Sequence, residues 1–284
     1  YAMKIAIFKD TCARSGIPVM QAFIDSIKDE DYIICDNNAR PEADVVVMWS
    51  VLLNMYGRKP IYTHYKNRAK LLIIEVGGLI RNESWRMGIG NINALANFAN
   101  QSVDDARLSK LKLDNPAPWK NGEHVIICTQ NVNSDAWTGG NIIDWCDKQV
   151  AWIRSQSDRY IYLRTHPRHQ VNLSQIANRY KGVYISTPKM TGNGDEVDFA
   201  SLLNNAHAVV NYNSNPAIEA VLQGVPVYVD ESSLCKPVGN LIGSDIENPA
   251  KPNRTEWLKQ ISYCEWFVDE IRQGLPWSRL KKQL

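Results

Sequence analysis

The chain has 284 residues, 44% of them apolar and 22% charged, a globular composition that excludes a disordered or fibrous protein. Its length fits one large domain or two ordinary ones. Lys and Arg number 32 against 30 Asp and Glu, a net charge of +2, which excludes a strongly basic nucleic-acid coat and an acidic tail but permits a local basic cleft.

The first half of the chain alternates apolar runs with helix-length segments. Runs rich in β-branched residues predict strands at 3–8, 32–35, 44–49, 60–63 and 71–75. Apolar residues at helical spacing predict a helix over 17–27. Because the apolar runs are continuous, we expect a parallel sheet buried on both faces. Residues 91–118, polar and ending in Asp-Asn-Pro-Ala-Pro, are the best linker candidate.

After the linker the same pattern begins again. The apolar runs predict strands at 124–128, 160–164, 183–185, 208–212 and 225–229. Helical spacing predicts helices at 142–155, 199–206, 216–223 and 255–273. The sequence therefore predicts two successive βαβ halves of similar size.

Membrane and redox signals are few. No run of about 18 apolar residues occurs, so no membrane span is expected. The six cysteines form no C-x-x-C pair, which predicts reduced, mostly buried thiols in a chain of this size. A cytoplasmic location follows from that expectation.

The segment with the richest chemistry spans residues 211–227 and reads NYNSNPAIEAVLQGVPV. A buried strand ends in a polar loop, and a helix follows with Asn215 as its N-cap and Pro216 as its first residue. The helix start offers N–H groups and the positive end of the helix dipole, which together favour an anion.

Side chains around this helix start extend the pattern. Asn213 and Ser214 add donors beside the anion position, and Glu219 lies one turn further on, where it can meet a ribose. An ordinary capped helix with a solvated Glu219 is the alternative interpretation.

A second polar string follows the strand at 160–164. It places Arg164, His166 and Arg168 where cations can meet a diphosphate. His166 and His169 are the only close histidine pair and have no nearby Cys or acidic partner, so no metal site is expected. The P-loop and G-x-G-x-x-G fingerprints are missing as well.

Together these segments resemble the donor-binding motifs of GT-B glycosyltransferases, most closely the capsular-polysaccharide and Kdo-transferase type. That type carries a strand, an Asn/Ser/Thr loop and a helix with Glu that ends in Gly-x-Pro-Val, and an Arg/Lys-x-His-Pro string elsewhere. It also has an acid ahead of Gly with a nearby Arg, where this chain has Glu75 and Arg81. The chain departs from the pattern at Val76, where an Asp is expected. Phage DNA β-glucosyltransferases also place an acid at the end of such a strand.

The resemblance implies an α/β, GT-B-like fold with two Rossmann-like domains whose parallel sheets face a cleft. It implies an acceptor domain at 1–116, a donor domain at 117–252 and a C-terminal helix at 253–284 that crosses back to the first domain. It also implies a nucleotide-diphosphate sugar, with UDP expected, as co-substrate, and neither a cofactor nor a metal.

The residues implied for each role follow. The donor site is expected to use Arg164, His166, Arg168, Asn213, Ser214, Asn215, Glu219, Gln130 and Thr187. The acceptor site is expected to use Arg81, Trp85 and Arg86.

An inverting transfer needs a general base in the first half. Glu75, which ends an apolar strand beside Gly77 and Gly78, is favoured, and Asp10 at the end of the first strand is the runner-up.

The acceptor is harder to predict. Residues 58–86 hold seven cations against two acids, a field that suits phosphate contacts. The leading expectation is a 5-hydroxymethylpyrimidine in phage DNA, modified in the host cytoplasm, with no protein partner evident. A surface or capsular polysaccharide is the next candidate. A nucleotide-sugar epimerase and a non-catalytic nucleotide-sugar or nucleic-acid binding module also stay open.

Overall fold

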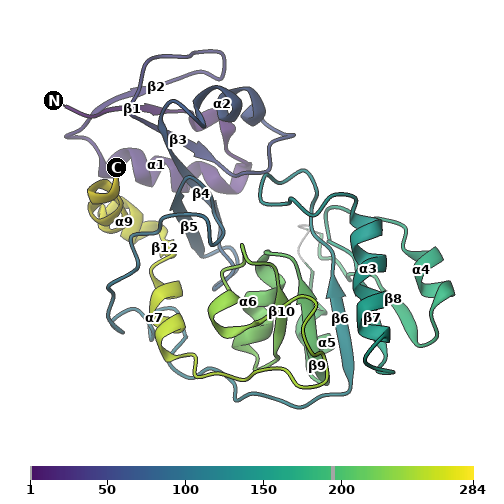
Figure 1. Cartoon of the computed structure of the whole chain (residues 1–284). Coiled ribbons are helices and arrows are strands. Elements are labelled where there is room, and N and C mark those ends of the chain that lie inside the picture. The colour runs from purple at the N-terminus through teal and green to yellow at the C-terminus, as the bar shows by residue number, and fades with distance from the viewer. Residues whose placement is uncertain (1, 193–195) are drawn as a thin grey trace. The chain divides into compact units, whose positions relative to one another are not determined.

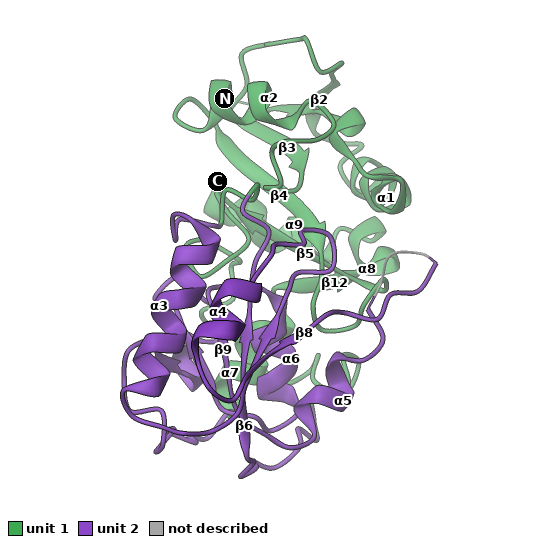
Figure 2. Cartoon of the chain, turned by 90° about the vertical axis from the view of Figure 1, so that its right-hand side faces the viewer, with its two compact units in different colours: residues 1–113, 133–136, 255–284 green, residues 114–132, 137–254 purple. Residues whose placement is uncertain are grey.

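The computed structural model describes residues 2–192 and 196–284 and divides the chain into two compact units (Figure 2). The first unit comprises residues 1–113, 133–136 and 255–284, and the second comprises 114–132 and 137–254. The boundaries expected from the sequence, 116 and 252, lie within three residues of these main divisions, but the short segment at 133–136 was not expected.

The first unit is built on a mixed sheet (Figure 1). Its strands, in the order β12-β5-β4-β3-β1-β2, are β12 (Glu265–Phe267), β5 (Ser84–Ile89), β4 (Lys70–Val76), β3 (Val45–Trp49), β1 (Lys4–Ile7) and β2 (Asp31–Ile34). Strands β1 to β4 pair in parallel, whereas β5 is antiparallel to both of its neighbours. The carboxyl ends of β1, β3 and β4 therefore lie at one edge of the sheet.

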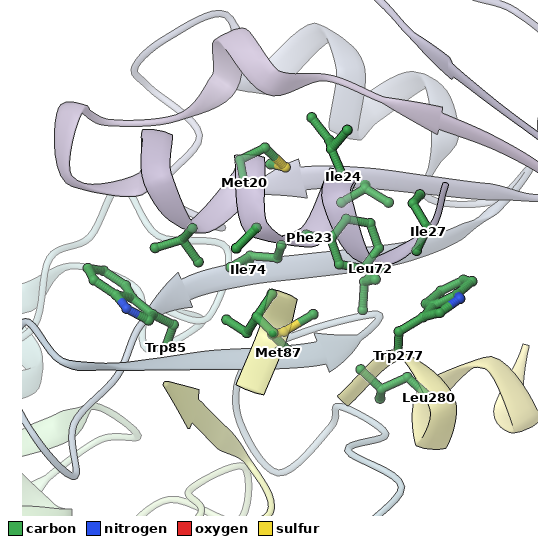
Figure 3. Packing of buried hydrophobic residues seen from close by; sticks show 14 of the residues in the cluster. Met20, Phe23, Ile24, Ile27, Leu72, Ile74, Trp85, Met87, Trp277 and Leu280 are labelled. Atoms are coloured by element: carbon green, nitrogen blue, oxygen red, sulfur yellow. The ribbon is translucent and has the colours of Figure 1, made fainter. Parts of the chain in front are cut away.

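Helices lie on both faces of this sheet. The helices of the unit are α1 (Ile17–Ser26), α2 (Arg58–Tyr65), α7 (Thr255–Ser262), α8 (Val268–Arg272) and α9 (Leu275–Leu280), with the 3₁₀ turns η1 (Lys9–Thr11), η2 (Arg14–Gly16) and η4 (Lys281–Gln283), and of these α1, α2, α8 and α9 pack on the sheet. One face packs against α1, α8 and α9, where Phe23 meets Trp277 edge to face with ring centroids 5.6 Å apart (Figure 3). The other face packs against α2 through Ile61, Tyr62 and Tyr65.

Two predictions for this unit are wrong. Residues 60–63 were expected as a strand but lie in α2, because Ile61, Tyr62 and Tyr65 bury one helical face and Pro60 falls in the first turn, where it is tolerated. The expected single helix over 255–273 is interrupted by β12, because a buried Glu265 ties this segment to β5.

The second unit has a fully parallel sheet. Its strands, in the order β11-β10-β9-β6-β7-β8, are β11 (Asn240–Leu241), β10 (Val227–Val229), β9 (Ala206–Asn211), β6 (His124–Cys128), β7 (Ile161–Arg164) and β8 (Val183–Ser186). Its helices are α3 (Ile142–Arg154), α4 (Ser174–Arg179), α5 (Phe199–Leu203) and α6 (Asn215–Leu222), with the turn η3 (Lys236–Val238). Helices α3 and α4 bury one face of the sheet, which gives a Rossmann-like arrangement.

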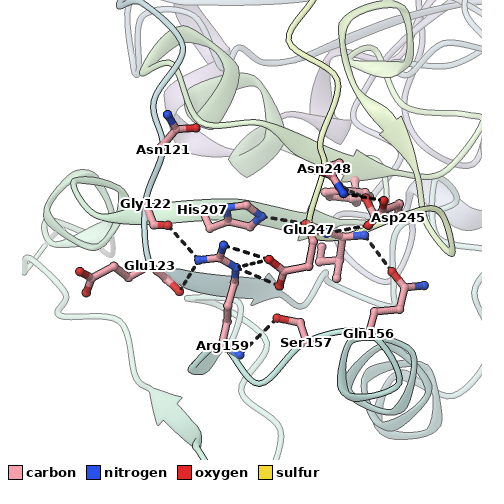
Figure 4. A network of polar contacts seen from close by, with 12 residues as sticks. Asn121, Gly122, Glu123, Gln156, Ser157, Arg159, His207, Asp245, Glu247 and Asn248 are labelled. Carbon is pink, nitrogen blue, oxygen red and sulfur yellow. Dashed lines mark hydrogen bonds and ion pairs between the residues drawn. The ribbon is translucent and has the colours of Figure 1, made fainter.

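The amino edge of this second sheet is closed by its own polar groups (Figure 4). Arg159 pairs with Glu247 at 3.0 Å and donates to the carbonyls of Gly122 and Glu123. Hydrogen bonds from Ser157 and Arg159 hold the pKa of Glu247 below its usual value. These groups serve the fold.

All six cysteines are buried and unpaired. In the described part of the chain, no helix combines the length and the apolar character that crossing a membrane requires.

Candidate active site

The carboxyl edge of the second sheet gathers polar residues from neighbouring strands. Asn211, Cys128, Arg164 and Ser186 stand side by side in the register of β9, β6, β7 and β8. Because all these strands are parallel, the loops that follow them leave the sheet at the same edge, which is where open α/β sheets bind ligands.

Helix α6 begins at this edge without a side-chain cap. Its N-cap is Ser214, one residue earlier than predicted, so that Asn215 is the first helical residue and Pro216 the second. The backbone N–H of Ser214 donates to Asn211 Oδ1 at 2.9 Å, and Asn211 Nδ2 donates to Ser214 Oγ at 3.0 Å. Asn211 therefore turns the Ser214 hydroxyl back toward the sheet, and Ser214 makes no capping hydrogen bond.

A chain of hydrogen bonds fixes the loop ahead of α6. Gln130 Nε2 donates to Asn213 Oδ1 at 2.7 Å, and Asn213 Nδ2 donates to Ser232 Oγ at 2.9 Å. Ser232 in turn donates to Asp230 Oδ2 at 2.5 Å. The loops after β6, β9 and β10 are thereby held together, and the predicted residues Gln130 and Asn213 are in direct contact.

Arg164 lies at this edge but its charge is already matched. The side chain is 3% exposed and donates to Asp198 Oδ1 at 2.5 Å, to Glu196 Oε2 at 2.6 Å and to Ser186 Oγ at 3.1 Å. The hydrogen bond from Arg164 is the main reason that the pKa of Asp198 falls to about 2. Arg164 was expected to be an open cation, but its buried side chain is ion-paired with two carboxylates.

The other predicted donor residues occupy less enclosed positions. His166 is half-buried, and its Nδ1 accepts from the backbone N–H of Arg168 at 3.0 Å, so that a neutral ring would carry its proton on Nε2. Arg168 and Thr187 are exposed. Burial chiefly, and the negative charge of Glu196 next, raises the pKa of the Cys128 thiol, whereas the charge of Arg164 opposes the shift.

In the first unit, Glu75 stands at the end of β4 as expected and is half-buried. Its Oε1 accepts from the backbone N–H of Val76 at 2.8 Å, and its Oε2 accepts from the hydroxyl of Ser50. Ser50, directly after β3, has φ +64°, the left-handed region that a non-glycine residue rarely adopts. Such strain often marks functional sites. Ser50 was not predicted, although a polar residue ending the neighbouring parallel strand was the available signal.

Arg58 is a buried cation whose charge interacts with that of Glu75. It is 2% exposed, and its Nε donates to the carbonyl of Thr11 at 2.8 Å. Burial lowers the pKa of Arg58, and the negative charge of Glu75 opposes that shift. Asp10, the runner-up base, lies exposed in η1 after β1.

The predicted acceptor residues do not all reach the surface. Arg86, expected as an acceptor-binding cation, is 4% exposed and pairs with the fully buried Glu265 at 2.8 Å, so its charge is matched inside the unit. Glu265 also accepts from the backbone N–H groups of Gly78 and Leu79 at 2.7 and 3.0 Å, which fixes the turn that follows Glu75.

Arg81 is exposed, whereas Trp85 is 4% exposed and packs on Trp49.

The seven cations of residues 58–86 do not form one patch. Arg58 and Arg86 are internal, while Lys66, Arg68 and Lys70 follow the end of α2 and lie at the amino end of β4, opposite the edge of Glu75. The local basic surface expected for a DNA acceptor is therefore divided between the two edges of the sheet.

Within residues 2–192 and 196–284, no three His, Cys, Asp or Glu side chains are grouped to hold a metal ion.

Comparison with known proteins identifies the fold. No protein-family model and no curated protein sequence matches the chain. The structure of Thermosulfurimonas dismutans KpsC, beta Kdo 2,4 transferase, aligns with a TM-score of 0.52 at 12% identity, covering 97% of this chain and 98% of that chain. The beta Kdo 2,7 transferase of the same KpsC aligns with 0.55 at 10% identity, covering 99% and 100%. A Methanocaldococcus jannaschii UDP-GlcNAc 2-epimerase reaches only 0.39 at 14% identity, covering 99% and 100%, which supports no argument.

At such identities the likeness concerns the fold alone. The chain has the two-unit α/β fold of GT-B glycosyltransferases, and the predicted GT-B-like fold is confirmed.

Proposed function

We propose that this protein transfers a sugar from a nucleotide sugar, with a UDP-sugar expected, to a hydroxyl group of an acceptor. The observation that carries the proposal is the start of α6, where Asn211 holds the Ser214 hydroxyl away from the capping position. An uncapped helix start favours an anion such as the phosphate of the donor. Glu219, half-buried one turn further on, is suited to bind the ribose.

The leaving phosphate gains negative charge as the glycosidic bond breaks, and the second unit must stabilise it. The dipole of α6 and the backbone N–H groups of its first turn are suited to this stabilisation. His166 and Arg168 follow β7 and can add cationic contacts, while Thr187 follows β8 at the nucleobase position. Arg164 acts as a positioning residue, because two carboxylates already balance its charge. The proposal includes turnover without a divalent metal.

Glu75 is the proposed general base. It takes the proton from the acceptor hydroxyl, and a single displacement then inverts the anomeric carbon. Ser50 holds one carboxylate oxygen, and Glu265 fixes the following turn, so the carboxylate is held in a defined orientation. Asp10 is the alternative base.

For the acceptor we favour a glycan hydroxyl over a hydroxymethylated base in DNA. The DNA expectation depended on one basic surface, and the cations of residues 58–86 are instead divided and partly internal. The name of the similar KpsC structures describes them as Kdo transferases, that is, enzymes of glycan chemistry. We also propose a reducing, cytoplasmic location, in keeping with six unpaired thiols.

The test is an incubation of the full chain with a panel of UDP-, CMP-, ADP- and GDP-sugars. Release of the free nucleotide is measured by chromatography, and transfer is measured by mass spectrometry with oligosaccharide acceptors and with hydroxymethylated DNA in separate reactions. We expect one donor to give transfer to an oligosaccharide. Transfer to DNA alone would identify hydroxymethylated DNA as the acceptor. The absence of both nucleotide release and transfer with every donor would refute the proposed function.

A further inference from the structure

The second unit contains a pocket of about 620 Å³ that none of the roles above uses. It lies along α3 and is bounded by residues that follow β9, β10 and β11, among them Tyr212 after β9 and Asp230 after β10. Helix α3 lines it with Trp145, Gln149 and Trp152, whose spacing of four and three residues places them on one helical face. The volume of the pocket is within the range of small-ligand sites.

Two residues of α3 bring unpaired polar atoms to this pocket. Trp145 is 8% exposed and Gln149 is 3% exposed. In the described part of the chain, the indole Nε1 of Trp145 and the Oε1 of Gln149 have no hydrogen-bond partner, yet both atoms keep accessible surface. Because each residue is more than nine-tenths buried and lines the pocket, the surface that it still exposes faces the pocket.

The hydrogen-bonding roles of these two atoms are fixed. An indole N–H can only donate. Gln149 Nε2 donates to the backbone carbonyl of Trp145 at 3.1 Å, which leaves the amide oxygen of Gln149 as the acceptor. A phosphate or a carboxylate could satisfy only the indole, and an ammonium group could satisfy only the amide oxygen. The pocket therefore favours a ligand whose groups both donate and accept, as hydroxyl groups do.

Asp230 adds a second acceptor that is held in place before any ligand arrives. Its Oδ2 accepts from the backbone N–H of Ser232 at 3.0 Å and from the hydroxyl of Ser232 at 2.5 Å. Its Oδ1 has no hydrogen-bond partner within residues 2–192 and 196–284. The other charged lining residues are the exposed Asp144 and Lys148, so two acids face one cation. This balance does not attract an anion, and it leaves carboxylate oxygens for hydroxyl donors.

The aromatic walls of the pocket suit a sugar better than a flat base. The rings of Trp145 and Tyr212 stand at 88° to each other with centroids 6.3 Å apart. A nucleobase cannot stack on two perpendicular rings at once, whereas the C–H groups of a sugar can pack on one face at a time. The half-buried rings of Tyr212 and Trp152 provide such apolar surface.

We infer that this pocket of the second unit binds a neutral saccharide unit. One sugar hydroxyl can accept from the indole N–H of Trp145, and others can donate to Gln149 Oε1 and Asp230 Oδ1. Trp145 and Gln149 lie beyond the capped start of α3, so the cap itself is not part of the site. Binding here needs neither a nucleotide sugar nor Glu75, and the inference therefore goes beyond the proposed transfer and does not depend on it.

The test uses the full chain labelled with ¹⁵N and titrated with methyl glycosides of glucose, galactose, mannose and N-acetylglucosamine. The indole N–H signal of Trp145 is assigned by its loss in Trp145→Phe. We expect at least one glycoside to shift that signal, and Gln149→Met, which keeps the length of the side chain but removes the amide, to weaken its binding roughly tenfold. The matched control is Gln175→Met, the same change at an exposed residue of α4 outside the pocket, which should leave the affinity unchanged.

Three results would overturn the inference: no glycoside shifts the Trp145 signal, Gln149→Met binds as Gln175→Met does, or uridine and cytidine shift the signal in place of the glycosides. The backbone amide spectrum of each variant shows whether it is folded. If Gln149→Met does not fold, Asp230→Asn takes its place, with a roughly fivefold loss of affinity expected and an unchanged affinity counting against the site.

Discussion

Helices α3 and α6 both follow strands of the second unit's parallel sheet, yet they begin in different ways. The start of α3 is capped, because the side chain of Asn141 accepts from the N–H groups of Ile143 and Asp144 at 2.9 and 3.1 Å. The start of α6 has no such cap, and its N-cap hydroxyl at Ser214 bonds to Asn211 instead.

The two helices also differ in the acidic residues of their first turns. Asp144 lies in the first turn of α3, where it compensates the positive end of the helix dipole, and α6 has no acid in its first turn. The start of α3 is thus completed by a side-chain cap and an acid of its own first turn, whereas the first turn of α6 supplies neither. At one edge of the same sheet, the polar groups at the start of α3 therefore serve folding, whereas those at the start of α6 suit a ligand.

The largest expected effect is on kcat. It distinguishes the proton transfer proposed for Glu75 from the donor binding proposed for α6. Glu75→Gln keeps the size of the side chain but removes the base, so kcat should fall roughly 10²- to 10⁴-fold while the donor KM stays nearly constant. Steady-state kinetics measure both values. Asp10→Asn is the matched control, and if it loses activity while Glu75→Gln keeps it, the base is Asp10.

Glu219→Ala tests the α6 side of the comparison. Losing the ribose contact should raise the donor KM more than tenfold, about 1.4 kcal/mol or more. Asp144→Ala removes the acid at the start of α3 and should leave the donor KM unchanged. Equal donor KM values in both variants and the wild type would remove Glu219 from the donor site.

The two N-cap residues should have different roles: Asn141 should affect mainly the stability of the fold, and Ser214 mainly the binding of the donor. Asn141→Ala removes a real cap and should cost about 1 kcal/mol of unfolding free energy in denaturant titrations, with an unchanged donor KM. Ser214→Ala removes no cap and should cost less stability, but it should raise the donor KM roughly fivefold. The reverse assignment of these effects would contradict the comparison.

We do not expect Arg164 to bind the donor directly, because Asp198 and Glu196 balance its charge. The pKa of Asp198 is lowered from 3.8 to about 2, chiefly by Arg164. A carboxylate with a lowered pKa stabilises the fold above its unfolded value and loses that contribution as the pH falls through its folded value. Asp198→Asn should therefore flatten the stability profile between pH 3.8 and about 2, whereas Asp158→Asn should not. Thermal unfolding across that range measures this, and identical profiles would argue against a paired Arg164.

The smallest expected effect is that of chelation. Excess EDTA should leave turnover unchanged, because the α6 dipole and the N–H groups of the first turn of α6 are proposed to stabilise the leaving phosphate. Complete loss of turnover with rescue by Mg²⁺ or Mn²⁺ would show that a metal does this work.

The fold was largely predictable because buried parallel strands are continuous apolar runs, as in β3 and β6. Strand β5 was missed because Arg86 interrupts its apolar pattern. The burial of Arg86 depends on its ion pair with Glu265, which is distant in the sequence. The same long-range pair broke the predicted C-terminal helix, a tertiary effect that no local pattern contains.

The candidate site was predictable where polar residues follow strands, as at Asn213 and Glu75. Side-chain pairing was not, because the contact that balances Arg164 joins it to Asp198, 34 residues away in the chain. The displaced cap at Ser214 likewise depends on how Asn211 folds back, a choice between hydrogen-bond partners that the sequence leaves open.

The most direct test of the central claim is a ¹⁵N–¹H titration of the full chain with the nucleotide-sugar panel, following four backbone amides. Asn215 and Ala217 report on the start of α6, and Ile143 and Asp144 report on the start of α3. Donor binding at α6 predicts large shifts for Asn215 and Ala217 with one nucleotide sugar and little change for Ile143 and Asp144. Shifts at α3 alone, or no shift at α6 with any nucleotide sugar, would contradict the account.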